Sequence, residues 1–152
     1  MGLTATLART IEWWDTDASG HHHNSTIMRL VESSEAKLMK ARGIRDYYFG
    51  AAPRVRQEID FEAILHFGQV ATTTVTIEKI GRTSLVLAFE VWAEEFDGRP
   101  RTRAAKGRLF TAHVPRGSKE SHPWPEHVIA ALTSSIGSSQ DRVGVGGSDD
   151  RG

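Results

Sequence analysis

A loop and a helix follow one another in residues 15–42, DTDASGHHHNSTIMRLVESSEAKLMKAR. The first part is small and polar and contains Gly20, a composition typical of loops. From Thr26 onward the period changes, because apolar and small residues recur on one helical face: Ile27, Leu30, Val31, Ser34, Leu38 and Ala41. The pattern predicts an amphipathic helix over residues 26–42, capped by Ser25 or Thr26.

Strand patterns lie before and after this helix. Alternating or β-branched residues predict five strands, over residues 4–14, 54–64, 69–80, 84–95 and 101–114. The segment around Gly50 and Pro53 is expected to be a loop, and residues 125–135 a short helix. One amphipathic helix needs a surface to cover. We therefore predict an α+β fold, in which a curved antiparallel sheet of about five strands wraps one long helix.

The last four strands are expected to form an antiparallel meander, with Asp97-Gly98 as one of its hairpin turns. The strand over residues 84–95 is largely apolar on both faces, which indicates a central position. Its outer face carries Trp92, and an exposed apolar face of this kind needs a partner. Oligomerisation, as a homodimer or homotetramer, is the simplest arrangement that supplies one.

Length and composition limit the classes of protein to which the chain can belong. The chain has 152 residues, which suits one domain, and we expect that domain over residues 1–136. Residues 137–152 have little to bury and are expected to form a disordered tail. The chain has no cysteine, which excludes disulfides and a thiol nucleophile. This composition agrees with a reducing compartment, so we expect a cytoplasmic protein.

The charge of the chain is balanced, with 19 basic and 19 acidic residues. No net field would draw it to nucleic acid or to an anionic membrane. No apolar stretch approaches the ~20 residues that a membrane helix needs. The densest basic run, residues 99–108, is typical of a solvated strand face. We therefore expect neither nucleic acid nor a membrane as a partner.

The residues most suited to chemistry lie in the loop before the helix. A predicted strand delivers Asp15 and Asp17 into this loop, which ends at a helix N-terminus. A helix N-terminus offers unpaired backbone N–H groups that can hold the oxyanion of a reacting carbonyl. A carboxylate beside them can act as a nucleophile or as a base for water. By itself, Asp-x-Asp before a helix more often forms a turn and a cap.

A wider motif around the two aspartates carries a family resemblance. The residues Glu12-Trp13-Trp14-Asp15-Thr16-Asp17-Ala18-Ser19-Gly20 resemble the opening motif of the 4-hydroxybenzoyl-CoA thioesterase family. These hotdog-fold acyl-CoA thioesterases include the Tol-Pal-associated type. Residues 66–68 and 80–85 resemble the family's third strand and the turn that follows it. The resemblance extends over about residues 4–114 and implies a hotdog fold and thioester hydrolysis, with no cofactor.

The resemblance also implies roles for individual residues. Asp17 matches the catalytic aspartate of the family, and the main-chain N–H at about Asn24 matches its oxyanion donor. Arg82 and Ser84 lie where related enzymes place residues near the CoA nucleotide, and an arginine suits a phosphate. A solvated turn residue is an equally good interpretation of Arg82.

The histidine run departs from the family pattern. Family members often carry apolar or aromatic residues where this chain has His21, His22 and His23, so we expect a different acyl pocket. One or two of these rings are expected to bind the acyl group or orient a water molecule. A metal site is disfavoured, because adjacent histidines point in different directions and no metal-ligand spacing supports one.

The other titratable residues are interpreted as structural or solvated. Glu32 and Glu35 lie on the predicted helix and are expected to be solvated charges, although family members often carry an acid near the place of Glu32. The scattered histidines are expected to be structural: His66, His113, His122 and His127.

The leading hypothesis is an acyl-CoA thioesterase with Asp17 as its nucleophile or general base. A second hypothesis is a thioesterase acting on acyl-carrier protein, which would show a basic docking patch such as residues 99–108. A third is a hotdog dehydratase or hydratase that pairs His23 with Asp17. The non-enzymatic hypothesis is an acyl-binding or assembly module, in which Asp17 only caps the helix.

Overall fold

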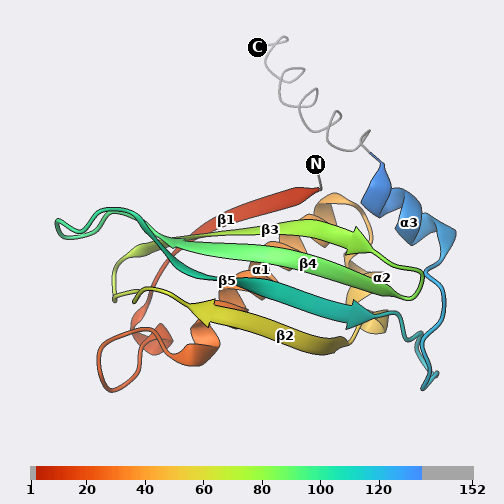
Figure 1. The fold of residues 1–152 in the computed structure, drawn as a ribbon, viewed down its shortest axis with the longest axis horizontal. Coiled ribbons are helices and arrows are strands. Elements are labelled where there is room, and N and C mark those ends of the chain that lie inside the picture. Colours follow the sequence, from red (N-terminus) through yellow and green to blue (C-terminus); the bar gives the residue numbers. More distant parts are fainter. Residues whose placement is uncertain (1–2, 135–152) are drawn as a thin grey trace, which may run out of the picture.

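The structure, a computed structural model, describes residues 3–134 of the chain. The elements of this part are β1 (Thr4–Thr10), the 3₁₀ turn η1 (Trp13–Asp15), α1 (Asn24–Ala41), α2 (Arg45–Ala51), β2 (Arg54–Phe61), β3 (Val70–Ile80), β4 (Ser84–Ala93), β5 (Thr102–Ala112) and α3 (Glu126–Thr133). Figure 1 shows the sheet from its open face, with α1 behind it. The predicted tail over residues 137–152 lies outside the described residues.

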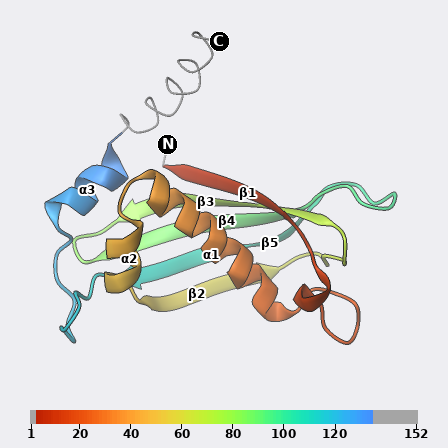
Figure 2. The ribbon, with the colours of Figure 1, turned by 180° about the vertical axis from the view of Figure 1, so that it is seen from behind.

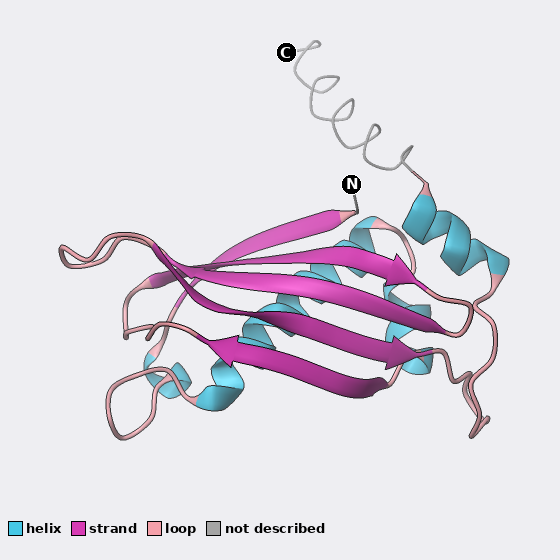
Figure 3. Ribbon diagram, in the orientation of Figure 1, coloured by secondary structure: helices cyan, strands magenta, loops and turns pink. Residues whose placement is uncertain are grey.

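The strands form one antiparallel sheet in the order β1-β3-β4-β5-β2. β3, β4 and β5 form a meander as predicted, with β4 in the centre. The predicted place of β2 beside β3 is wrong, because β2 pairs with β5 at the far edge (Figure 3). The reason is the helix: α1 crosses the back of the sheet between β1 and β2, so the chain resumes at the opposite edge (Figure 2).

The apolar face of α1 makes the core with the sheet. The predicted face is confirmed at five of its six positions, since Ile27, Leu30, Val31, Ser34 and Leu38 are buried. Ala41, the sixth, is exposed. The small side chain of Ser34 lets the helix approach β3, where its Oγ donates to the carbonyl oxygen of Thr73 at 3.1 Å. Gly43 then ends the helix with a φ of 77°.

A buried carboxylate lies in α1 where the sequence predicts a solvated charge. Glu35 is 0% exposed, and its carboxylate accepts two hydrogen bonds from the Arg54 guanidinium at 3.0 Å. The Tyr48 hydroxyl donates a third, at 2.6 Å. The interpretation of Glu35 as solvated is therefore wrong, because the ends of α2 and β2 close over it and supply these donors. Glu32, one turn earlier, is exposed.

The segment before β2 is the helix α2 rather than the predicted loop. Ile44, Tyr48 and Ala51 are buried at helical spacing, and they pack this short element against the end of α1. The presence of Gly50 and of Pro53 favours a loop prediction locally. Packing overrides that local preference, because the three apolar side chains find a common surface.

The outer face of the sheet is polar. Threonine hydroxyls pair across β1 and β3 at 2.9 Å, in the pairs Thr4–Thr76 and Thr6–Thr74. Trp92 is half-buried, donates from Nε1 to Glu90 at 3.0 Å, and lies 4.3 Å from the Arg101 guanidinium carbon. The prediction of an apolar outer face around Trp92 is therefore wrong. The large apolar side chains that are exposed are Trp13, Trp14, Phe49, Val55, Phe61, Ile64, Phe67 and Val70.

Candidate active site

The loop that carries the two aspartates lies at one end of the sheet. β1 ends at Thr10, four residues before the predicted boundary, and Trp13–Asp15 form a 3₁₀ turn instead. A capping box between Glu12 and Asp15 holds this turn: the Asp15 carboxylate accepts the Glu12 N–H at 2.7 Å. The turn directs the chain off the sheet and toward the N-terminus of α1 (Figure 1).

Asp15 anchors the loop. Its side chain is 2% exposed and accepts two hydrogen bonds from the Arg9 guanidinium, at 2.9 and 3.1 Å. Burial alone would raise the pKa of Asp15, but hydrogen bonds from Arg9 and the Glu12 N–H, with the charges of Arg9 and Arg29, outweigh burial and lower it. Because the Asp15 carboxylate is buried and both of its oxygens accept hydrogen bonds from Arg9 or Glu12, Asp15 is suited to structure rather than to catalysis.

The main chain of Asp15 also fixes the start of α1. Its carbonyl oxygen accepts the N–H of His23 at 2.7 Å and the Oγ1–H of Thr26 at 2.7 Å. Residues 16–22 therefore form a short loop whose two ends, Asp15 and the start of α1, are held together. Within it, Thr16 pairs with His22 as in a small hairpin, and Asp17 N–H donates to the His21 carbonyl at 2.9 Å.

Asp17 lies at the turn of this hairpin and is exposed. Its Oδ1 accepts the main-chain N–H of Ser19 at 2.8 Å and the Ser19 hydroxyl at 2.5 Å. These two hydrogen bonds, more than the charges of His21 and His23, lower the pKa of Asp17 below its ordinary value. The carboxylate is thus ionised at neutral pH and open to a ligand.

The N-terminus of α1 follows directly. His23 caps the helix, because its Nδ1 accepts the Ser25 N–H at 3.1 Å, so the predicted caps Ser25 and Thr26 are both wrong. Asn24 is the first helical residue, and no acceptor among the described residues receives its main-chain N–H. A free donor at a helix N-terminus can stabilise a developing oxyanion.

The histidines of the run have three different environments. His22 is half-buried, accepts the Leu65 N–H on Nδ1 at 3.1 Å, and stacks on Phe61 with ring centroids 6.3 Å apart. Burial, the largest effect, lowers the pKa of His22. His21 pairs with His66 through a main-chain bridge and an edge contact at 5.6 Å. His22 and His23 therefore both use Nδ1 to hold the loop, and their role in the acyl pocket stays a prediction.

Three exposed aromatic side chains, Trp13, Trp14 and Phe67, form an aromatic rim beside the loop that reasoning from the sequence did not find. Trp13 and Trp14 are 68% and 74% exposed, and Trp13 meets the edge of Phe67 at 5.9 Å. Ser19 was also not predicted as a site residue, although a hydroxyl two residues after an aspartate is a common turn arrangement. The Trp-Trp dipeptide next to Asp-Thr-Asp is the signal that marks the rim in the sequence.

Arg82 and Ser84 lie at the other end of the same sheet. They follow β3, whose residues 70–80 extend for about 30 Å. The carbonyl oxygens of Arg82 and Ser84 accept the main-chain and indole N–H groups of Trp124 at 3.1 and 2.9 Å. The Arg82 side chain is exposed. One chain therefore does not bring Arg82 and Asp17 together.

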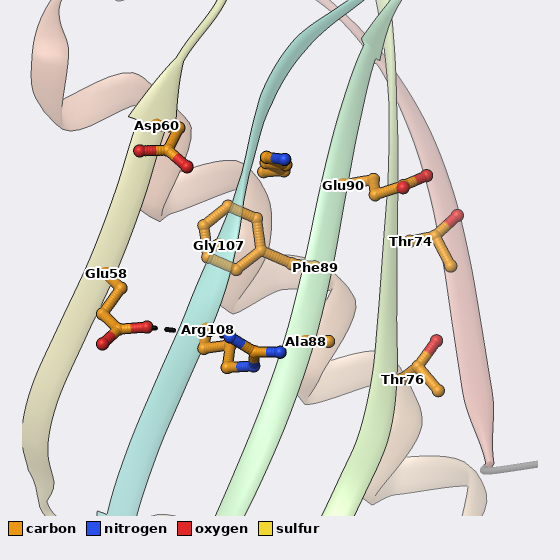
Figure 4. Close-up of a pocket in the computed structure, with 10 residues that line it drawn as sticks. Glu58, Asp60, Thr74, Thr76, Ala88, Phe89, Glu90, Gly107 and Arg108 are labelled. Carbon is orange, nitrogen blue, oxygen red and sulfur yellow. Dashed lines mark ion pairs between the residues drawn. The ribbon is translucent and has the colours of Figure 1, made fainter.

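A hollow lies away from the loop, on the outer face of the sheet (Figure 4). It measures about 430 Å³ and is open to solvent. Its lining mixes both signs of charge, from Glu58, Asp60 and Glu90 to Lys106 and Arg108. Such a surface lacks the convergent polar groups and the apolar walls of a small-molecule site.

Two further features concern metals and membranes. Among residues 3–134, no three His, Asp or Glu side chains lie close enough together to hold a metal ion. The described helices include none that is long and apolar enough to cross a membrane.

The family model of the thioesterase-like superfamily matches residues 11–132, which include the aspartate loop, α1 and the whole sheet after β1. The chain belongs to the thioesterase-like superfamily. The predicted hotdog fold, family and enzyme class, a thioester hydrolase, are thereby confirmed.

Solved thioesterase structures share this fold. A predicted thioesterase from Bacillus stearothermophilus is 26% identical, with a TM-score of 0.73, over 86% of this chain and 94% of its own. A 1,4-dihydroxy-2-naphthoyl-CoA thioesterase from Synechocystis is 18% identical, with a TM-score of 0.74, over 87% and 97%. A 4-hydroxybenzoyl-CoA thioesterase mutant complexed with 4-hydroxybenzoyl-CoA is 16% identical, with a TM-score of 0.74, over 86% and 99%. Among curated protein sequences, no match to this chain was found.

Proposed function

We propose that the protein is an acyl-CoA thioesterase that hydrolyses its substrate to a free acid and CoA at the Asp17 loop. The observation that carries this proposal is that one loop holds two groups: the exposed, ionised carboxylate of Asp17 and, where the loop enters α1, the free main-chain N–H of Asn24. Family membership supplies the reaction class, and the loop supplies the two groups that the reaction needs.

The reaction follows from these groups. The thioester carbonyl accepts the Asn24 N–H, which holds the negative charge that forms on its oxygen. Either an Asp17 oxygen attacks the carbonyl carbon, or Asp17 takes a proton from the water that attacks it. In both routes the carbon–sulfur bond breaks, and the thiolate leaves and is protonated to CoA. When water attacks, the free acid forms directly. When Asp17 attacks, the acyl group is held as an anhydride with Asp17, and a water molecule then hydrolyses this anhydride to the free acid and the Asp17 carboxylate. A thiolate is a good leaving group, so little acid assistance is needed.

A dimer would complete the site, and we propose that it forms through β2. This edge strand exposes Val55 and Phe61 by 62% and 52%, and an open edge favours strand addition. Antiparallel pairing about Gln57 would place Arg56 opposite Glu58 of the partner subunit. Since the two chains then run in opposite directions, the Arg82 turn of each would lie at the same end as the other's Asp17 loop.

Contacts of the basic run and of His23 weigh against the other hypotheses on function. The basic run that could dock a carrier protein is largely neutralised, because Arg101, Arg103 and Arg108 all pair with glutamates within 3.1 Å. A dehydratase would need His23 turned toward Asp17, whereas His23 Nδ1 bonds to Ser25. An acyl-binding module would not need an ionised and open carboxylate.

The decisive experiment is a hydrolysis screen of the Asp17→Asn variant against the wild type. Aromatic, short, medium and long acyl-CoAs are offered, and the free thiol is measured. We expect turnover by the wild type on at least one of them and a loss of about a hundredfold or more in the variant. Equal turnover by Asp17→Asn or Asp17→Ala would instead support an acyl-binding module with an unrelated background activity.

A further inference from the structure

Only one oxygen of the Asp17 carboxylate is free to react. Oδ1 accepts both donors of Ser19, the N–H at 2.8 Å and the hydroxyl at 2.5 Å. Oδ2 has no hydrogen-bond or ion-pair partner among the described residues. The two oxygens of this carboxylate therefore have different environments, although the side chain is on the surface.

We propose that Ser19 is the positioning residue of the site: its hydroxyl fixes the Asp17 carboxylate so that Oδ2 alone is presented to the thioester. This proposal rests on the proposed function, because it assigns a role within the same reaction. A free aspartate at a surface rotates about χ2, which is broad for a carboxylate. Two donors on one oxygen remove that freedom before substrate binds.

The surrounding turn supports such a role, because it holds Ser19 as well. The Gly20 N–H donates to the Asp17 carbonyl at 2.9 Å, and Gly20 has a φ of 84°, which favours glycine at that position. The Asp17 N–H is held by His21. Both hydrogen bonds from Ser19 also favour the charged carboxylate, so they keep Asp17 ionised as the pH falls. The charges of His21 and His23 act on Asp17 in the same direction.

The test separates the hydroxyl from the main-chain donor. Ser19→Ala keeps the N–H but loses the hydroxyl, Ser19→Thr restores a hydroxyl, and Ser33→Ala removes an exposed hydroxyl elsewhere, on α1. We expect Ser19→Ala to lower kcat about tenfold, with KM nearly unchanged, as for a charge-assisted hydrogen bond. Its acidic limb in the pH profile of kcat should move to higher pH. Ser19→Thr should recover most of kcat, and Ser33→Ala should match the wild type.

A second measurement does not depend on turnover. The Asp17 carboxyl carbon, assigned by difference from Asp17→Asn, can be titrated by ¹³C NMR in the wild type and in Ser19→Ala. Its pKa should be higher in Ser19→Ala, because one hydrogen bond to the charged form is lost. If the pKa of Asp17, the pH profile and kcat of Ser19→Ala all equal those of the wild type, the proposal for Ser19 is overturned. If Asp17→Asn is inactive at the same time, the proposed function still holds, whereas an active Asp17→Asn overturns the function itself.

Discussion

At the scale of single residues, two aspartates in one motif have opposite environments. Asp15 is buried, and its carboxylate accepts hydrogen bonds from the Arg9 guanidinium and the Glu12 N–H. Asp17, two residues later, is exposed and keeps one oxygen free. A buried, fully paired carboxylate holds a structure, and an open one is available for chemistry. This contrast assigns the scaffold role to Asp15 and leaves Asp17 as the proposed reacting group.

Asp15→Asn should therefore act on stability more than on chemistry. The change leaves the Arg9 guanidinium without its bidentate partner and places an amide against it, which we expect to cost about 2–3 kcal/mol in the free energy of unfolding. Because the pKa of Asp15 is lowered by folding, its contribution is present above the unfolded pKa and disappears as the pH falls through the folded one. Denaturant unfolding at pH 7 measures the loss. A stable Asp15→Asn with little remaining turnover would mean that Asp15 is the reacting carboxylate.

His22 makes the loop sensitive to mild acid. Its Nδ1 accepts the Leu65 N–H, so protonation would break that bond, and burial lowers its pKa. The unfolded chain takes up the proton first, at about pH 6.5, so stability should fall from that pH down to the lower folded pKa. We expect His22→Asn, which keeps an acceptor in place of Nδ1 but does not titrate, to lose less stability between pH 7.5 and 5.5. The melting temperatures of the wild type and of His22→Asn, measured across this pH range, give the dependence of stability on pH for each protein. An equal dependence in both would contradict this prediction.

At the scale of the elements, Gly107 marks a close approach between β5 and β2. A Cβ at this position would lie 1.8 Å from the carbonyl oxygen of Glu58 and 2.7 Å from the ring of Phe89. The Phe89 ring fills the space that a side chain at this position would otherwise take. No larger residue fits there without moving a strand.

Gly107→Ala should therefore weaken the fold, because the nearest atom belongs to the backbone and cannot rotate away. We expect a loss of about 3 kcal/mol or more in the free energy of unfolding. Lys106→Ala, at an exposed neighbour, is the matched control and should change stability by less than about 0.5 kcal/mol. Urea denaturation measures both, and equal midpoints for the two variants would show that β2 yields easily at this point.

At the scale of the whole molecule, the site loop and the Arg82 turn lie at opposite ends of the sheet. A second copy paired through β2 would bring these ends together, so activity is expected to depend on the oligomer. In the single chain, Arg56 and Glu58 form an exposed ion pair at 2.5 Å. Two-fold pairing about Gln57 would allow the same residues to pair between chains.

Charge exchange on β2 tests this arrangement. Arg56→Glu would place two like charges opposite each other in the dimer, so sedimentation should show a weaker dimer, and hydrolysis should fall with it. The double variant Arg56→Glu/Glu58→Arg restores opposite charges and should recover both. A wild type that is monomeric at micromolar concentration, or an Arg56→Glu dimer of wild-type affinity, would rule out β2 as the interface.

The sequence by itself determined what depends on local pattern. The helical spacing from Ile27 to Leu38 and the strand alternation were enough for an α+β fold with a sheet wrapped round one helix, because periodicity decides which faces are buried. The hotdog fold and the family were predicted from the resemblance that the motif around Asp-Thr-Asp carries. Asp17 as the working carboxylate, predicted from the motif, is still a proposal.

Only the tertiary structure decided what depends on residues far apart in the chain. It placed β2 beside β5, buried Glu35 between Tyr48 and Arg54, and put Arg82 at the end remote from Asp17. The first two depend on how α1 crosses the sheet, since the crossing decides which edge the chain reaches next. The third follows from the antiparallel pairing of β1 with β3, because the loop after β1 lies at the start of β3 and Arg82 lies beyond its end. A charged residue on an amphipathic helix has the same local pattern whether its neighbour in space is water or an arginine. For that reason, no spacing in the sequence distinguishes Glu35 from Glu32.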